Sequence, residues 1–208
     1  YTKVTFNYKN KSYSIKTHLI GKFNLYNIMG AMLSSLHLGL NMNQIILAVE
    51  SFKKVPGRLE QVPLNNNNYA IIDFAHSPDS FENVLSTIAE ISNKKIITVF
   101  GCGGDRDKTK RPIMGSIAEK YSSAIYITND NPRGEDEDSI IDDITAGFEK
   151  NIHVVIKNRE NALNQVLDSV TNKIIVVLGK GKKNYKIIGN EKKYHSDIDI
   201  IKKYKNEN

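Results

Sequence analysis

Hydrophobic and polar residues alternate along the first 19 residues, YTKVTFNYKNKSYSIKTHL, on both sides of a polar KNK triplet. Alternation with a period of two is typical of half-buried strands, so this stretch predicts a β-hairpin. Apolar residues then recur at helical spacing through residues 23–40, where Gly39 is a stop signal, and through residues 41–52. The sequence therefore predicts a hairpin and two helices before a break at Pro56–Gly57.

From Pro56 onward, short apolar runs alternate with helical segments. Several of these runs are continuously apolar, which is typical of parallel strands that helices cover on both faces. We expect strands at residues 69–74, 94–100, 123–128, 153–157 and 173–178. We expect helices at residues 78–91, 110–121, 137–150 and 159–170.

The predicted fold class is therefore α/β, with a Rossmann-like, mostly parallel sheet and helices on both of its faces. Residues 185–189 are expected to add a last strand and residues 196–204 a last helix. The asparagine run at residues 65–68 is expected to be a loop between two strands. The break at Pro56–Gly57 predicts two domains, residues 1–55 and residues 56–208.

Composition narrows the function only slightly. The chain has 208 residues, 40% of them hydrophobic, and a formal net charge of +6 that lies partly in a lysine-rich C-terminal segment. Such a scattered charge favours a solvated surface over a nucleic-acid interface, so no nucleic-acid partner is expected. We also expect no membrane partner, since no apolar run approaches the roughly 18 residues of a membrane span. The single cysteine fits a reducing compartment, and the missing initiator methionine leads us to expect a fragment of a longer protein.

The unusual residues gather in the turns that follow the predicted strands. In an open parallel sheet, ligands bind beyond the carboxyl ends of the strands, so these turns are where chemistry is expected. The turns read AHSP, GCGGDRDKTKR, NDNPRGED, NRE and GKGKKN, beginning at residues 75, 101, 129, 158 and 179.

The turn GCGGDRDKTKR combines glycines with four cationic residues. Glycine lets backbone amides approach an anion, and an arginine such as Arg106 can bind a carboxylate or phosphate through two parallel hydrogen bonds. A tight turn that carries surface lysines is the equally open alternative. The turn matches neither the phosphate-binding pattern GxxxxGK[ST] nor GxGxxG, and Cys102, which has no evident histidine partner, is interpreted as a packing residue.

Two further turns carry candidate ligand groups. His76 is expected either to contact a bound ligand or to lie near a helix start, and the sequence offers it no second metal ligand. Asp130, Asn131 and Arg133 place a carboxylate, an amide and a guanidinium on a proline-stiffened turn, which suits a zwitterion such as an amino acid. An ordinary turn before an acidic helix start is the alternative.

Taken in order, six motifs resemble the C-terminal part of the Mur ligase family, and within it the type that adds a diamino acid, MurE. They are GKFNLYN, VPGRLE, DFAHSPDSFENVL, FGCGGDRDKTKRPIMG, TNDNPRGED and GKGKKNYKIIG. The resemblance covers nearly the whole chain and implies the end of a central ATP-binding domain, to about Val55, followed by a complete amino-acid-binding domain. The family's phosphate loop GTxGKT and its carbamylated lysine are absent here, so the resemblance implies no catalytic residue in this chain and an inactive isolated fragment.

The resemblance implies an ATP-dependent amide-bond ligase of peptidoglycan synthesis, acting in the cytoplasm as a monomer. ATP would phosphorylate the carboxylate of UDP-N-acetylmuramoyl-L-alanyl-D-glutamate, and the amine of a diamino acid would attack the acyl phosphate. Mg²⁺ would be held mainly by the missing part of the central domain. A non-catalytic or degraded ligand-binding remnant is the alternative, and an upstream GTxGKT segment would separate the two.

The resemblance also assigns residues to the two ligands. Asn24 and Asn27 would contact the adenine of ATP, and Phe23, beside Asn24, stands where the family usually has a histidine. Arg58 would bind the nucleotide, Asp73 would bind its ribose, and His76 would lie near the nucleotide. The amino-acid contacts would be Arg106, Asp130, Asn131, Arg133 and Gly179. The DNPR motif resembles the version that selects meso-diaminopimelate, whose far carboxylate would pair with Arg133.

Lys183 departs from the family, which has a glutamate at this position to hold the distal ammonium of the diamino acid. A cation in its place would repel that ammonium. Three explanations stay open: Lys183 points away, the amino acid differs and is meso-lanthionine or a related diamino acid, or the copy is degraded.

Overall fold

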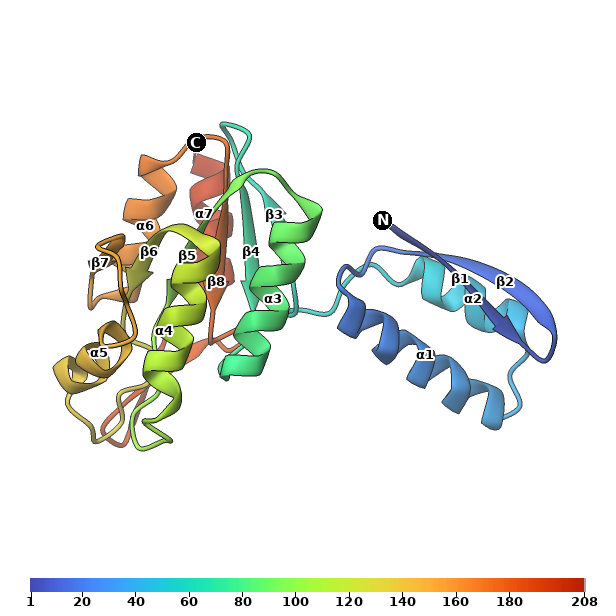
Figure 1. The fold of residues 1–208 in the computed structure, drawn as a ribbon, viewed down its shortest axis with the longest axis horizontal. Coiled ribbons are helices and arrows are strands. Elements are labelled where there is room, and N and C mark those ends of the chain that lie inside the picture. Colours follow the sequence, from blue (N-terminus) through green and yellow to red (C-terminus); the bar gives the residue numbers. More distant parts are fainter. Residues whose placement is uncertain (208) are drawn as a thin grey trace. The chain divides into compact units, whose positions relative to one another are not determined.

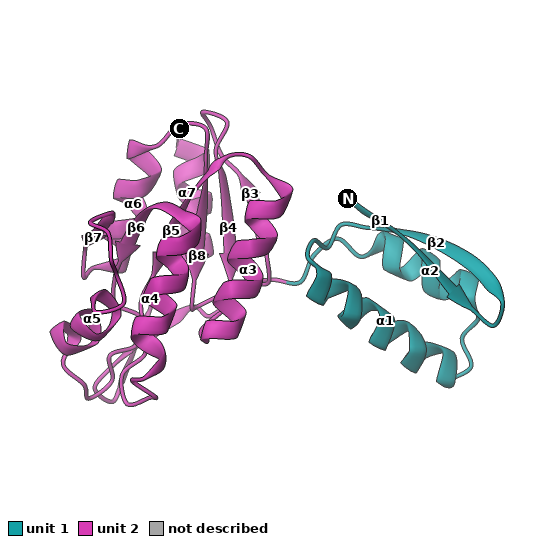
Figure 2. Ribbon diagram, viewed as in Figure 1, with its two compact units in different colours: residues 1–55 teal, residues 56–208 magenta. Residues whose placement is uncertain are grey.

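The structure, a computed structural model, describes residues 1–207. The chain divides into two compact units, residues 1–55 and residues 56–208, which we call unit 1 and unit 2 (Figure 2).

Unit 1 begins with the hairpin that the alternating pattern predicted. Strand β1 (Thr2–Tyr8) pairs antiparallel with β2 (Lys11–Thr17), and Lys9 and Asn10 make the turn with φ of 46° and 62°. Two consecutive positive φ values are typical of the two-residue turns that match the twist of paired strands. Helices α1 (Lys22–His37) and α2 (Met42–Ser51) follow, so both predicted helices are confirmed.

The core of unit 1 is small. Four side chains from β2, α1 and α2 form its buried apolar cluster: Ile15, Ile28, Met32 and Ile45. Other apolar side chains of the same helices are exposed, among them Tyr26 at 66%, Leu33 at 56% and Leu47 at 67%. This exposure leaves the helices with an apolar surface that the hairpin does not cover.

Unit 2 is built on one six-stranded sheet in the order β3-β4-β8-β5-β6-β7 (Figure 1). All neighbours are parallel except the edge strand β3, which pairs antiparallel with β4. The strands are β3 (Glu60–Pro63), β4 (Tyr69–Asp73), β5 (Lys95–Phe100), β6 (Ser122–Ile127), β7 (His153–Val155) and β8 (Lys173–Leu178). The predicted α/β fold class and the loop at residues 65–68 are confirmed.

Helices cover both faces of this sheet. Val99 of β5 packs in a cluster with side chains of α6 and α7, whereas the next residue, Phe100, contacts Phe81 of α3 with ring centroids 5.0 Å apart. Because successive strand residues point to opposite faces, α3 and α6 lie on opposite sides. The helices are α3 (Pro78–Ile91), α4 (Lys110–Tyr121), α5 (Glu137–Thr145), α6 (Arg159–Ser169) and α7 (Asp197–Glu207).

In the second half, one helix is shorter than expected, and the strand expected at residues 185–189 forms but lies outside the main sheet. The helix expected at residues 137–150 ends at Thr145, and Gly147 then packs so closely that an added Cβ would lie 1.9 Å from the Pro112 carbonyl oxygen. Residues 185–189 do not extend the main sheet. They contain β9 (Tyr185–Ile188), which pairs antiparallel with the unpredicted β10 (Glu191–Tyr194) in a separate hairpin that turns at Gly189 with φ of 55°.

A buried charge network holds α6 and α7 together. The Arg159 guanidinium donates two hydrogen bonds to the Asp197 carboxylate, both at 2.9 Å, and a third to the Leu178 carbonyl. The His195 imidazole lies 2.8 Å from the same carboxylate. Burial alone would raise the pKa of Asp197, but the charge of Arg159 and the hydrogen bond to His195 hold it below its usual range.

Candidate functional site

The carboxyl ends of the parallel strands bring the unusual turns together. Strand β8 lies between β4 and β5 in the sheet. The chain runs from β4 to α3 and from β5 to α4 on one face of the sheet, but from β8 through the β9–β10 hairpin to α7 on the other face (Figure 1). Such a reversal is where open α/β sheets form ligand crevices. The turn at residues 179–184 therefore lies between the turns at residues 74–77 and 101–109.

The turn after β5 packs directly on the turn after β6. An added Cβ at Gly104 would lie 1.9 Å from the Pro132 carbonyl oxygen, and one at Gly101 would lie 1.8 Å from the Thr128 carbonyl oxygen. Gly104 N–H also donates to the Asn131 carbonyl oxygen at 2.9 Å. Glycine is required at both positions because the two backbones approach more closely than any side chain allows. The turns GCGGDRD and DNPR are thus one structural body.

A buried arginine fixes this body to helix α4. Arg111 is fully buried, and its guanidinium binds both oxygens of Glu135 at 2.7 Å, Asp143 at 2.8 Å and the Gly103 carbonyl oxygen at 3.2 Å. This two-pronged pairing orients the acidic segment after the DNPR motif. In the sequence, Arg111 is only one of four cations in its turn, because nothing in the motif distinguishes a buried arginine from an exposed one.

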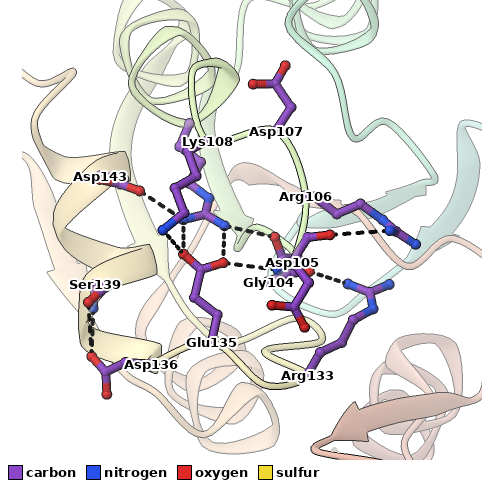
Figure 3. Close-up of polar contacts among 12 residues, drawn as sticks. Gly104, Asp105, Arg106, Asp107, Lys108, Arg133, Glu135, Asp136, Ser139 and Asp143 are labelled. Atoms are coloured by element: carbon purple, nitrogen blue, oxygen red, sulfur yellow. Dashed lines mark hydrogen bonds and ion pairs between the residues drawn. The ribbon is translucent and has the colours of Figure 1, made fainter.

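Glu135 is the acceptor at the centre of this arrangement. Besides Arg111, it accepts from Lys108 at 2.8 Å and from the Asp105 backbone N–H at 3.0 Å (Figure 3). Hydrogen bonds from Arg111 and then Lys108 hold the pKa of Glu135 well below its usual range. Its carboxylate is therefore charged and fully engaged in holding the two turns in register.

Two arginines of the turns are left for a ligand. Arg106 is exposed and donates only to the Asp105 carbonyl oxygen, at 3.2 Å; Arg133 is half-buried and donates to the Gly104 carbonyl oxygen at 2.7 Å. Both side chains border one point, since a Cβ placed on Gly103 would lie 2.9 Å from Arg133 Nη1 and 3.9 Å from Arg106 Cγ. Figure 3 shows both guanidinium groups directed to the same side, away from Glu135. Neither forms a salt bridge with any described residue, so both can bind carboxylates.

Asp130 and Asn131 lie at the same place but are partly engaged inside the protein. The Lys180 ammonium is buried and donates to Asp130 Oδ1, Asn131 Oδ1 and the Tyr185 carbonyl oxygen at 3.1 to 3.2 Å. Burial lowers the pKa of Lys180, and the Asp130 carboxylate opposes that shift. Asp130 therefore anchors the loop, whereas the Asn131 side-chain nitrogen has no hydrogen-bond partner among residues 1–207. Lys180 itself was missed, because a lysine in a basic turn gives no signal of burial.

Gly179 begins the turn after β8 with φ of 109°, and an added Cβ would lie 2.7 Å from Asp130 Oδ2. This contact brings the turn after β8 against the turn after β6. The structure therefore brings Arg106, Asp130, Asn131, Arg133 and Gly179 together at one edge of the sheet.

Lys183 lies elsewhere, on an aromatic ring at the end of β4. Its ammonium is 4.5 Å from the centroid of Phe74, and the Arg58 guanidinium is 4.8 Å from the same centroid. The His76 ring lies 4.7 Å from the Phe74 ring, and Lys110 donates to the His76 carbonyl oxygen at 2.9 Å. We call Arg58, Phe74, His76 and Lys183 the Phe74 cluster. Of the three explanations for Lys183, this position favours the first.

Asp73 is turned into the protein. Its two oxygens accept the backbone N–H groups of Leu59 at 2.8 Å and Ala75 at 2.7 Å, and only 3% of the residue is exposed. Burial raises its pKa, although the two amides and the charge of Arg58 oppose that shift. The carboxylate anchors the turn that carries Arg58, and a contact between Asp73 and a ribose stays a prediction.

In unit 1, Asn24 and Asn27 line a cavity of about 410 Å³ between α1, α2 and β2. The side-chain nitrogen of Asn24 donates to the Ile20 carbonyl oxygen at 2.7 Å, and that of Asn27 reaches Asn24 Oδ1 at 3.4 Å. The rest of the lining is mainly apolar. The adenine contacts predicted for both residues stay predictions.

Other chemistry has less support. Within residues 1–207, no three His, Cys, Asp or Glu side chains gather as a set of metal ligands. Cys102 is buried, and burial raises its pKa to about 12, so its thiol stays protonated and serves as a packing group as predicted. No helix of the described part has both the length and the apolar character needed to cross a membrane.

Comparison with known proteins finds a matching family and several similar proteins. Residues 57–181 match the family described as Mur ligase, glutamate ligase domain. The chain is 41% identical over 199 residues to the UDP-N-acetylmuramoyl-L-alanyl-D-glutamate--2,6-diaminopimelate ligase of Fusobacterium nucleatum, covering 94% of this chain and 41% of that protein. It is 45% identical over 195 residues to the protein of the same name from Buchnera aphidicola, covering 92% of this chain and 38% of the relative.

A solved structure of a ligase with this name is similar as well, with a TM-score of 0.70, 28% sequence identity, and coverage of 99% of this chain and 42% of that one. The chain thus spans about 40% of the length of the curated relatives it matches.

Proposed function

The chain belongs to the Mur ligase family, and from this premise we propose that it is the C-terminal part of an ATP-dependent ligase. The ligase would add a diamino acid to UDP-N-acetylmuramoyl-L-alanyl-D-glutamate during peptidoglycan synthesis. It would act in the cytoplasm as a monomer on small-molecule substrates. Unit 2 would bring the amino acid to the activated carboxylate.

The observation that carries this proposal is a pair of guanidinium groups beside Gly103 that form no salt bridge with any described residue. Arg106 and Arg133 come from turns that the Arg111–Glu135 pairing holds rigidly, and each guanidinium keeps most of its donors free. Two fixed guanidinium groups suit a ligand with two carboxylates, because each carboxylate can accept a pair of parallel hydrogen bonds from one guanidinium. The unpartnered Asn131 side-chain nitrogen would donate a further hydrogen bond to such a ligand. Positioning of this kind is what an amide ligation needs from its protein groups.

The nucleotide would lie at the Phe74 cluster. The Arg58 and Lys183 cations flank one aromatic ring, and the nearest carboxylate, Asp73, is engaged with backbone amides. An arrangement of cations without a free carboxylate favours phosphate groups. ATP would supply the phosphoryl group that activates the carboxylate, and Mg²⁺ would be held mainly by the missing part of the central domain.

Unit 1 would be the end of the central ATP-binding domain. Its four-residue core is small for 55 residues, and α1 and α2 expose Tyr26, Leu33 and Leu47. A unit this small buries a modest share of its apolar surface by itself, so further contacts would stabilise it. The proposal therefore expects the remaining part of that domain to cover these helices and to complete the site around Asn24 and Asn27.

The amino acid would be meso-diaminopimelate. The feature that favours it over lysine is Arg133, because lysine has no distal carboxylate for that guanidinium to bind. Lys183 lies on Phe74 and would not oppose the distal ammonium.

The proposal is tested on the full-length parent protein by measuring ATP-dependent phosphate release with UDP-N-acetylmuramoyl-L-alanyl-D-glutamate. Meso-diaminopimelate, meso-lanthionine and L-lysine are offered in turn, and the 208-residue chain alone serves as the inactive control. Turnover with meso-diaminopimelate but not lysine is expected. Turnover with lysine alone would overturn the role given to Arg133, and a folded parent without any turnover would favour a non-catalytic remnant.

A further inference from the structure

A pocket of about 390 Å³ lies beside Arg133, at the point where the DNPR motif meets the β9–β10 hairpin. Arg133 N–H donates to the Ile187 carbonyl oxygen at 3.3 Å, and Gly189 N–H donates to the Arg133 carbonyl oxygen at 2.8 Å. The hairpin is therefore fixed against the motif. The residues that line the pocket include Asp105, Arg133 and Lys192, together with the apolar Ile187.

The charges in this pocket match both groups of an amino-acid terminus. Arg133 and Lys192 supply two cations, and Asp105 supplies one carboxylate. Asp105 forms no ion pair with any described residue, and its side chain accepts one hydrogen bond within residues 1–207, from the Gly134 N–H to Oδ2 at 3.1 Å. A carboxylate and a guanidinium that border one pocket without pairing leave room for a ligand that carries both an ammonium and a carboxylate.

The neighbouring carboxylates are engaged elsewhere. Both oxygens of Glu135 bind Arg111, and Lys108 binds the same group. Asp130 is bound to the buried Lys180. Among these, Asp105 is the carboxylate that lines the pocket beside Arg133, and its Oδ1 accepts no hydrogen bond from residues 1–207. Its backbone φ of 52° is unusual for a residue other than glycine.

We infer that Asp105 receives the distal ammonium of the incoming diamino acid, while Arg133, with Lys192 beside it, binds the distal carboxylate. This assignment rests on the proposed function and names the residue that replaces the family's glutamate, whose position Lys183 occupies. It explains how the chain recognises a diamino acid although the turn after β8 offers no carboxylate. Asp105 is a specificity residue, since it would discriminate between ligands with and without the second ammonium.

The test is a nuclear magnetic resonance titration of the 208-residue chain with three amino acids. Meso-2,6-diaminopimelate carries both distal groups, L-2-aminopimelate lacks the distal ammonium, and L-lysine lacks the distal carboxylate. In the unmodified chain, meso-diaminopimelate should bind about fivefold more tightly than 2-aminopimelate, the ratio expected for one partly exposed charge pair. Resonances of residues 105, 133 and 187–192 should shift.

Asp105→Asn is the decisive variant. Asparagine tolerates a positive φ and can still accept the Gly134 N–H, so the fold should be retained. The ratio between the two ligands should fall to about one. Asp107→Asn is the matched control, because Asp107 lies in the same turn but binds the Thr109 N–H and hydroxyl at 2.9 and 2.7 Å. It should keep the original ratio.

The results that would overturn this inference differ from those that would also overturn the proposed amino-acid site. An unchanged ratio in Asp105→Asn, or shifts confined to residues outside the pocket, would overturn the inference and leave the proposed function standing. An equal fall in the Asp107→Asn control would also overturn it. Absence of binding by all three amino acids to the folded, unmodified chain would overturn the inference together with the proposed amino-acid site.

Discussion

Replacing Arg111 by methionine should lower the free energy of unfolding of unit 2 by about 3 kcal/mol. The guanidinium makes four hydrogen bonds from a fully buried position, and methionine fills similar space without any of them. Removing one partner of a buried ion pair costs about 3–5 kcal/mol, because the other charge is left without compensation. Glu135 would keep Lys108 and the Asp105 N–H, so the lower end of that range applies.

The matched control is Lys108→Met, which removes a second cation from the same Glu135. The Lys108 side chain is 63% exposed and makes one contact at 2.8 Å. An exposed ion pair contributes at most about 1 kcal/mol, so this variant should differ little from the unmodified chain. The assay is urea unfolding of the 208-residue chain, followed by the methyl resonances of Ile97 and Ile175, which lie in the core of unit 2.

A double variant completes the experiment. The double variant Arg111→Met/Glu135→Gln should lose about 1–2 kcal/mol less unfolding free energy than the sum of the losses in the two single variants. The reason is that the two residues contact each other directly. Equal losses for Arg111→Met and Lys108→Met, or strict additivity in the double variant, would refute the view that a buried ion pair aligns the two turns.

Three other predictions follow from the same geometry. Gly104→Ala should cost about 2 kcal/mol, because its Cβ would meet the Pro132 carbonyl oxygen, whereas Gly134→Ala, where the nearest atom is at 3.5 Å, should be close to neutral in the same urea assay. The pKa of Asp197 is lowered, so the ionised carboxylate stabilises the folded state above about pH 4, and this stabilisation is lost as the pH falls. Asp197→Asn should therefore flatten the decline of unfolding free energy between about pH 4 and pH 2, measured by acid titration. Cys102 should resist alkylation by iodoacetamide at pH 8 in the folded chain and react once urea unfolds it, as mass spectrometry would record.

The order of elements was available from the sequence because it depends on local periodicity. Alternation predicted the β1–β2 hairpin, and continuous apolar runs predicted the parallel strands. The turns after these strands were identified as the place of the site for the same reason, since strand direction fixes which ends meet. The grouping of Arg106 with Arg133 in one ligand site was expected from the resemblance to the Mur ligase family.

Local periodicity could not predict which charged residues are buried. Arg111, Arg159 and Lys180 lie in turns or at helix starts, where polar residues are normally exposed, yet each is enclosed by partners distant in sequence. Likewise, β10 is a run of exposed polar residues, and it forms a strand because it pairs with β9. Burial of a charge depends on what packs over it, and that is a property of the assembled fold.

The sequence by itself therefore determined the α/β class, the turns that carry the site, and the departure at Lys183. Only the tertiary structure decided that Lys183 lies on Phe74 and that Asp130 and Glu135 are engaged internally. It alone showed that Asp105 shares a pocket with Arg133 and Lys192. The physical reason is that a turn residue's role depends on which neighbours already satisfy its hydrogen bonds, and those neighbours come from strands far apart in the chain.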